Sequence, residues 1–169
     1  MKNIVLFGFM GTGKTLIAKI MEERKGLRRV DMDDIIEQRE GKTISRIFSE
    51  DGESYFRNCE QKIAVELGKK SDLIISTGGG VVLNKSNIIN LSKNGVCVCL
   101  NATPETVYNR VKHETHRPLL QNGDPMTTIR EMLANRKIFY DAVPFQVVTD
   151  NKTPDIICDE IEKIYSENQ

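Results

Sequence analysis

The residues most able to do chemistry begin with a glycine-rich segment near the N-terminus. Residues 8–15 read Gly-Phe-Met-Gly-Thr-Gly-Lys-Thr and match G-x-x-x-x-G-K-[ST] at every fixed position. Glycines let the backbone curl so that successive N–H groups face an anion, and a helix that starts here adds its positive end. The alternative is a glycine turn with a surface lysine. The residues that we expect to bind nucleotide phosphates are Gly11, Thr12, Gly13, Lys14, Thr15 and Leu16.

Within this loop, two side chains have distinct expected roles. Lys14 should reach the β- and γ-phosphates, and the Thr15 hydroxyl should bind Mg²⁺. The context fits, because an apolar run precedes the loop and a helical pattern follows it. ATP or a related nucleotide is therefore the expected ligand.

A second candidate group is the carboxylate pair Asp31 and Asp33. We expect a strand over residues 29–32, and side chains two apart on a strand project to the same face. The carboxyl ends of strands in an open α/β sheet line the ligand crevice, so the pair should lie near the phosphate loop. One carboxylate could hold Mg²⁺ through water while the other accepts the proton of an attacking hydroxyl. The alternative is a solvated strand end that caps a helix expected at Asp34.

A third candidate is the segment Ser-Thr-Gly-Gly-Gly at residues 76–80. Three successive glycines cost conformational entropy on folding, so a physical use is expected. Bare backbone allows a ligand to approach closely and offers unobstructed N–H groups. A loose turn is the alternative.

These segments need a scaffold, and short apolar runs alternate with amphipathic stretches along the chain. This alternation predicts one α/β doubly wound domain over residues 1–169, with a five-stranded parallel sheet flanked by helices. Thr103-Pro104 and Thr153-Pro154 each combine a hydroxyl cap with proline at the first helical position. The expected strands are 4–7, 29–32, 73–76, 96–100 and 145–149, and the expected helices are 14–24, 34–39, 53–67, 84–91, 104–111, 126–142 and 154–165.

The composition argues against several other classes of protein. Lys+Arg and Asp+Glu both total 24 in 169 residues, so the chain lacks a nucleic-acid binder's overall basic charge. Its four cysteines show no zinc-binding spacing and are expected to be free thiols, with Cys97 and Cys99 on one face of a strand. The N-terminal residues do not resemble a signal peptide, and no apolar run approaches membrane-spanning length. We expect a cytoplasmic protein that binds neither nucleic acid nor membrane.

Several motifs together resemble those of shikimate kinases in order and approximate spacing. They are residues 8–15, 31–33, Phe-Arg-Asn-Cys-Glu at 56–60, residues 76–80, Arg-Pro-Leu-Leu at 117–120, and Asn135-Arg136. The resemblance covers about residues 4–150. It implies a P-loop kinase fold and ATP-dependent phosphorylation of the 3-hydroxyl of shikimate, a step of aromatic amino-acid biosynthesis, with Mg²⁺ as cofactor and a monomeric enzyme.

The resemblance also implies roles for individual residues. Arg57 and Arg136 would hold the shikimate carboxylate, and Glu60 would orient Arg57. Asp33 would either accept the proton of the acceptor hydroxyl or only position that hydroxyl. Asp31 would join Thr15 at the metal. The expected acceptor site is Asp33, Arg57, Glu60, Gly78, Gly79, Gly80 and Arg136, within and beyond a helical region at about residues 33–61.

The polar segment at residues 113–125 resembles the family's lid. Its Arg117 would neutralise the transferred phosphoryl group together with Lys14 and Mg²⁺, and closure would exclude water. Arg110 and Asn151 resemble positions beside adenine. The segment 149–152 departs from the family in having no adenine-reading arginine.

Other functions share some of these features. A gluconate or nucleoside-monophosphate kinase would share the phosphate loop, but it does not predict residues 56–60 and 76–80 together. A GTP switch needs Asn-Lys-x-Asp, whereas residues 151–154 read Asn-Lys-Thr-Pro. An ATP sensor without catalysis would need no acceptor pocket.

Overall fold

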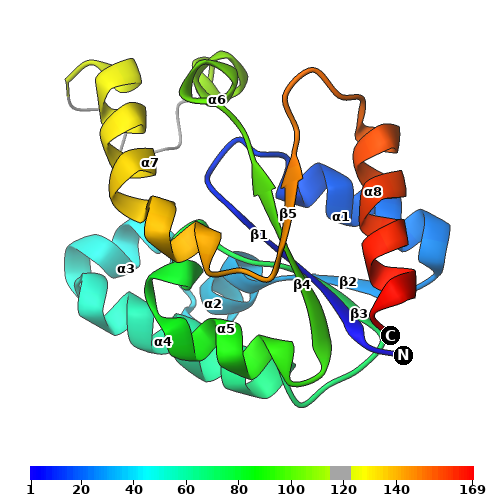
Figure 1. Cartoon of the computed structure of the whole chain (residues 1–169). Helices are drawn as coiled ribbons and strands as arrows, with labels where there is room; N and C mark the ends of the chain where they lie inside the picture. The colour runs from blue at the N-terminus through cyan, green and yellow to red at the C-terminus, as the bar shows by residue number, and fades with distance from the viewer. Residues whose placement is uncertain (115–122) are drawn as a thin grey trace.

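A five-stranded parallel sheet organises the described residues, 1–114 and 123–169, in a computed structural model (Figure 1). The strand order β2-β3-β1-β4-β5 puts β1 at the centre, between β3 and β4. The strands are β1 (Asn3–Gly8), β2 (Arg28–Asp31), β3 (Leu73–Ser76), β4 (Gly95–Asn101) and β5 (Phe145–Val148). The predicted fold class and all five strands are therefore confirmed.

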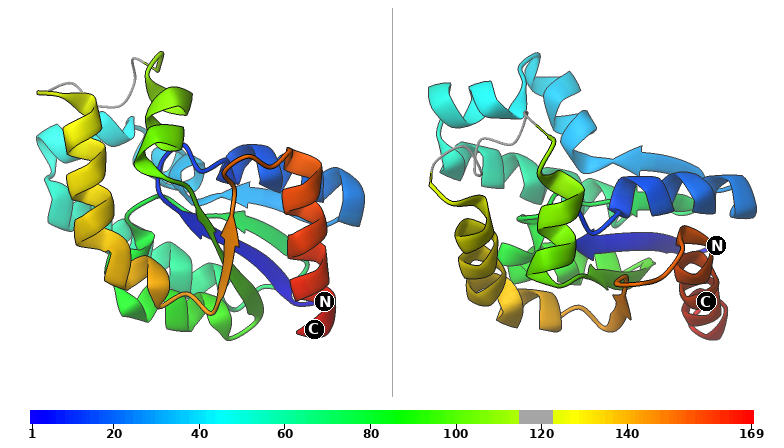
Figure 2. Two further views of the ribbon diagram at one scale, coloured as in Figure 1. Left: turned by 45° about the horizontal axis from the view of Figure 1, so that its top comes forward. Right: turned by 90° about the horizontal axis from the view of Figure 1, so that it is seen from above.

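Helices cover both faces of the sheet (Figures 1 and 2). Helices α1 and α8 pack on one face, and the helices from α2 to α7 contribute to the core on the other. Their bounds are α1 (Lys14–Lys25), α2 (Met32–Glu40), α3 (Ile44–Glu50), α4 (Glu53–Leu67), α5 (Lys85–Ser92), α6 (Pro104–Val111), α7 (Pro125–Asp141) and α8 (Pro154–Glu167), with the short 3₁₀ helix η1 (Val81–Leu83) after β3. No described helix is long and apolar enough to cross a membrane.

The pleat of the central strands divides the core into two clusters. In β1, Val5 and Phe7 join the cluster beneath α4 and α5, while Ile4 and Leu6 join the cluster beneath α1 and α8. In β4, Cys97 and Cys99 share the first of these faces, as their spacing predicts. All four cysteines are buried free thiols, which confirms the prediction.

The predicted helix starts at Thr103 and Thr153 are confirmed. The Thr103 hydroxyl accepts a hydrogen bond from the Thr106 N–H, and the Thr153 hydroxyl accepts one from the Ile156 N–H. Proline occupies the first turn of both helices, where a missing N–H has no intrahelical partner to lose.

Two local predictions differ from the structure. Helix α3, capped by Thr43, lies in a stretch for which no element is predicted. It has seven residues and buries Ile47, so its amphipathic pattern is too short to be distinctive. Helix α2 begins at Met32, two residues before the predicted start, because Asp31 caps it.

Candidate active site

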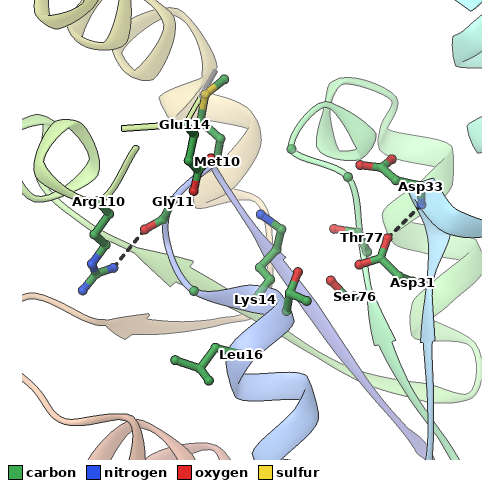
Figure 3. Close-up of a pocket in the computed structure, with 14 residues that line it drawn as sticks. Met10, Gly11, Lys14, Leu16, Asp31, Asp33, Ser76, Thr77, Arg110 and Glu114 are labelled. Atoms are coloured by element: carbon green, nitrogen blue, oxygen red, sulfur yellow. Dashed lines mark hydrogen bonds between the residues drawn. The ribbon is translucent and has the colours of Figure 1, made fainter. Parts of the chain in front are cut away.

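The predicted phosphate loop borders a cavity of about 390 Å³ at the carboxyl edge of the sheet (Figure 3). Its size is in the range of small-molecule sites. The sheet register explains the position, because Ser76 pairs with Leu6 of β1 and with Asp31 of β2. The lining residues are Met10, Gly11, Gly13, Lys14, Thr15, Leu16, Asp31, Asp33, Ser76, Thr77, Gly78, Gly79, Arg110 and Glu114.

The loop between β1 and α1 has the curled backbone that its glycines predict. Gly8, Gly11 and Gly13 all have positive φ angles, of 149°, 73° and 98°. Gly13 is the N-cap of α1 and has no side chain with which to cap it. The first N–H groups of α1 can therefore serve an anion.

The polar side chains of the loop divide into two roles. Lys14 lines the cavity, and its Nζ donates to the carbonyls of Gly8 and Phe9 at 2.8 and 2.9 Å. Thr12 is buried and donates to the Phe9 carbonyl at 2.8 Å, so its side chain stabilises the turn within the loop. Of the predicted ATP-binding residues in the loop, Thr12 is the one that does not line the cavity.

Asp31 and Asp33 both line the cavity, but the predicted reason for their proximity is wrong. Strand β2 ends at Asp31 and α2 begins at Met32, so the two residues do not alternate along one strand. Asp31 is instead the N-cap of α2 and accepts from the Asp33 N–H at 2.9 Å (Figure 3). Aspartate is favoured at this position, and Asp33 in the first turn faces the helix dipole favourably.

Asp33 has the electrostatics of a functional carboxylate. Burial raises its pKa to about 6, the Asp31 charge adds to the shift, and Lys14 opposes it. Its Oδ1 atom is buried and has no hydrogen-bond partner among the described residues. A buried carboxyl oxygen without a donor is uncommon, and in a residue that lines a cavity it marks Asp33 as a candidate functional group.

The triple glycine passes between this carboxylate and the phosphate loop, and each glycine leaves space for a different neighbour. A Cβ on Gly78 would lie 2.7 Å from Asp33 Oδ1, and one on Gly80 would lie 2.2 Å from Arg57 Nη1. A Cβ on Gly79 would be 3.6 Å from the Met10 N atom. Much of the space that the glycines free is thus filled by the protein itself.

The predicted Arg57–Glu60 pair is present on α4. Arg57 Nη1 lies 2.7 Å from Glu60 Oε2, and Nη2 lies 3.1 Å from Glu53 Oε1, a partner that was not predicted. Glu60 is only 1% exposed, and burial raises its pKa above the usual value although Arg57 pulls it down. Its second oxygen has no hydrogen-bond partner in the described part of the chain.

Arg136 comes from a different helix, α7. Its Nη1 lies 3.5 Å from the Gly79 carbonyl oxygen, and its guanidinium carbon lies 5.9 Å from the centre of the Phe9 ring. Arg57 packs against Gly80. The two arginines that are predicted to hold the acceptor carboxylate therefore contact the same triple-glycine segment.

The predicted adenine-side residues occupy different places. Arg110 lines the cavity, and its Nη1 donates to the Gly11 carbonyl at 3.0 Å and to the Thr149 hydroxyl at 3.2 Å. Asn151 lies in the β5–α8 loop with φ of 56° and does not line the cavity.

Arg117 and most of the predicted lid, 113–125, lie outside the described residues. Asp124 and Pro125 are described, and there they form the N-cap and first residue of α7.

Four lining residues were given no individual role from the sequence, although each lies in a segment that was singled out. Ser76 and Thr77 lie in the glycine segment, where the strand end was a usable signal. Met10 is a variable position of the phosphate-loop pattern, and Glu114 follows α6. In the described part of the chain, no group of three or more His, Cys, Asp or Glu side chains forms a metal cluster.

Comparisons with known proteins agree with one another. A relative from Thermodesulfovibrio yellowstonii, described as shikimate kinase, is 43% identical over 98% of this chain and 95% of its own length. The solved structure of shikimate kinase from Acinetobacter baumannii in complex with shikimate superposes with a TM-score of 0.93 at 31% identity, covering 100% of this chain and 95% of that one. Shikimate kinase from Aquifex aeolicus gives a TM-score of 0.84 at 30% identity, covering 98% of this chain and 97% of that one. The family model described as shikimate kinase matches residues 10–166, and the chain belongs to the shikimate kinase family.

Proposed function

We propose that the cavity between the phosphate loop and the triple glycine is where this enzyme transfers the γ-phosphoryl group of ATP to the 3-hydroxyl of shikimate. The observation that carries the proposal is that Lys14 of the phosphate loop and Asp33, with its unpartnered buried oxygen, line one cavity. Phosphoryl transfer depends mainly on alignment and on neutralisation of charge, and this arrangement supplies both.

On the nucleotide side, the amides of the loop and of the α1 N-terminus would bind the phosphates. Lys14 would exchange its contacts with the Gly8 and Phe9 carbonyls for the β- and γ-phosphates. Arg110 donates to the Gly11 carbonyl and would border the nucleoside together with Leu16 and Asn151.

On the acceptor side, two guanidinium groups would hold the shikimate carboxylate. Arg57 and Arg136 both contact the triple-glycine segment, and their planar donors match a carboxylate. Glu60 orients the Arg57 guanidinium, because its Oε2 atom lies 2.7 Å from Arg57 Nη1. The Asp33 carboxylate would accept a hydrogen bond from the reacting hydroxyl, and the backbone of Gly78, Gly79 and Gly80 would contact the ring.

Thr15 and Asp31 are the residues that we propose for Mg²⁺. Both line the cavity and offer hard oxygen atoms, and Asp33 adds a carboxylate within the same cavity. Mg²⁺ keeps several waters and takes one or two carboxylates plus substrate phosphates, so these residues fit it without a larger acidic cluster. When bound, the ion would neutralise charge on the β- and γ-phosphates.

Other parts of the proposal rest on the sequence. Arg117, outside the described residues, would neutralise the transferred phosphoryl group from the lid at 113–125. We propose that the enzyme acts as a cytoplasmic monomer with no nucleic-acid partner, in keeping with equal totals of 24 basic and 24 acidic residues.

The proposed role of Arg136 in holding the shikimate carboxylate is tested by Arg136→Ala, with Arg130→Ala as a matched control on the same helix. Arg130 pairs with Glu105 at the surface, where its side chain is 59% exposed. Arg136→Ala should raise the KM for shikimate by about 100-fold, as expected for lost charged hydrogen bonds, and change the KM for ATP little. Equal rises in the KM values for both substrates would reject this role of Arg136.

A coupled assay of ADP release tests the reaction itself. Shikimate, gluconate and nucleoside monophosphates are supplied in parallel, and only shikimate should give rapid turnover. Preferred turnover of another acceptor would reject the proposed function.

A further inference from the structure

The triple glycine is held by a tyrosine that the proposed reaction does not otherwise use. Tyr140 lies one helical turn after Arg136 on α7 and is 4% exposed. Its hydroxyl donates to the Gly79 carbonyl oxygen at 2.6 Å. The same oxygen is 3.5 Å from Arg136 Nη1, which is a much longer contact.

The carbonyls of the three glycines show why this contact matters. The Gly78 carbonyl accepts from the Val81 N–H at 3.2 Å, and the Gly80 carbonyl accepts from the Leu83 N–H at 3.0 Å. Both bonds lie within the turn that leads into η1. The Gly79 carbonyl instead points to α7, where its described donors are the Tyr140 and Arg136 side chains. Tyr140 therefore ties the middle of the segment to a distant helix.

The direction of the Gly79 carbonyl also determines the direction of the next N–H. The peptide unit is planar and trans, so the Gly80 N–H points opposite to the Gly79 C=O. Glycine has the freest backbone of all residues, so the plane between two glycines depends on external contacts for its orientation.

We infer that Tyr140 is a positioning residue for the acceptor: its hydroxyl fixes the Gly79–Gly80 peptide plane and leaves the Arg136 guanidinium available for the acceptor carboxylate. Without that hydroxyl, the Gly79 carbonyl would draw on Arg136 as its donor and compete with the acceptor. Burial raises the pKa of Tyr140 to about 12, against the opposing effect of the Arg136 guanidinium beside the hydroxyl, so the hydroxyl keeps its proton at neutral pH. The inference rests on the proposed function, because it concerns the same acceptor site.

The nucleotide side should depend less on this tyrosine. Gly79 lies next to the phosphate loop, since a Cβ there would be 3.6 Å from Met10 N. The loop has its own support, however, because the buried Thr12 hydroxyl donates to the Phe9 carbonyl. Loss of the Tyr140 hydroxyl should therefore act selectively on the acceptor.

The experiment compares Tyr140→Phe with Tyr165→Phe. Tyr165 is a matched control, because it is 2% exposed and its hydroxyl donates to a backbone carbonyl, that of Lys2, at 2.7 Å, on the α8 side of the sheet. Each variant removes one buried hydroxyl and keeps the ring. Tyr140→Phe should raise the KM for shikimate about tenfold, as expected when a buried carbonyl loses its donor, and change the KM for ATP less than about twofold. Tyr165→Phe should leave both constants unchanged.

Amide hydrogen exchange supplies a readout that does not need turnover. Residues 77–83 should exchange faster in Tyr140→Phe than in the wild type, and at the wild-type rate in Tyr165→Phe. Unchanged exchange in Tyr140→Phe, an unchanged KM for shikimate, or equal rises in both KM values would overturn the inference. The proposed function fails separately, if the wild-type enzyme does not phosphorylate shikimate.

Discussion

At the scale of single residues, the site is built from polar atoms placed against bare backbone. Gly78 and Gly80 lie so close to Asp33 and Arg57 that an added methyl group would force the carboxylate or the guanidinium to move. Gly79 has ordinary van der Waals space. None of the three has a positive φ angle, so at Gly78 and Gly80 the reason for glycine is space and not backbone conformation.

This difference predicts different outcomes for two neighbouring substitutions. Gly80→Ala should displace the Arg57 guanidinium and raise the KM for shikimate about 10- to 100-fold, the equivalent of one charged hydrogen bond. Gly79→Ala should have a much smaller effect. Steady-state kinetics with each substrate varied in turn measures both, and a larger effect of Gly79→Ala would contradict the packing argument.

At the scale of elements, the loop after β5 is tied to the start of α6. The Asp150 carboxylate accepts from the Thr103 N–H at 3.1 Å, the Thr103 hydroxyl at 2.8 Å and the Thr106 hydroxyl at 2.5 Å. Thr103 therefore caps its helix and also binds a distant strand end. This junction therefore anchors the N-terminal end of α6, the helix that precedes the predicted lid.

The two Thr-Pro helix caps should therefore contribute differently to the free energy of unfolding. Thr103→Ala should lower the free energy of unfolding by about 1–2 kcal/mol, because it loses a cap and a bond to a carboxylate. Thr153→Ala, at an equally exposed cap, should cost about 1 kcal/mol or less. Urea unfolding followed by circular dichroism compares the two, and equal costs would show that the Asp150 contact adds nothing.

At the scale of the whole molecule, the parallel sheet gathers charge at one edge. The phosphate loop, the β2–α2 junction and the triple glycine all follow the carboxyl ends of adjacent strands. Packing these ends beneath helices buries Asp33 and Glu60, which raises the pKa of each. These buried carboxylates, which are proposed to serve function, are thus expected to lower the free energy of unfolding.

The cost can be measured at Asp33. Its folded pKa of about 6 lies above the ordinary 3.8, so the folded state holds the proton more tightly than the unfolded chain. Stability should therefore fall as pH rises from about 4 to about 6 and stay lower above that. Asp33→Asn should remove this dependence and raise the free energy of unfolding at pH 8 by about 1–3 kcal/mol in metal-free, ligand-free protein, while depressing kcat sharply.

For a second aspartate, Asp72, the expected pH dependence of stability has the opposite sign. Hydrogen bonding to the N-terminal amino group lowers the pKa of Asp72, so its charge favours folding above its ordinary pKa and loses that effect in acid. Asp72→Asn should make the protein slightly less stable at pH 8. Urea unfolding at pH 4 and pH 8 covers both variants, and a destabilised Asp33→Asn protein at pH 8 would contradict the argument.

The sequence alone was sufficient for features that depend on local pattern. The phosphate loop at residues 8–15, the five strands, the caps at Thr103 and Thr153 and the buried thiols follow from the types and spacing of neighbouring residues. The ordered motifs also led to the correct family. Each signal lies within a few residues of chain, where backbone preference and periodicity act directly.

Tertiary structure decided what depends on contacts between distant residues. Asp31 and Asp33 were expected to meet the cavity by strand alternation, yet a helix cap turns them there. Sequence reasoning also missed the contact between Tyr140 and Gly79, 61 residues apart, and the packing of Arg57 on Gly80. Such contacts leave no local period in the sequence, because they arise only when the sheet register brings separate strand ends to one edge.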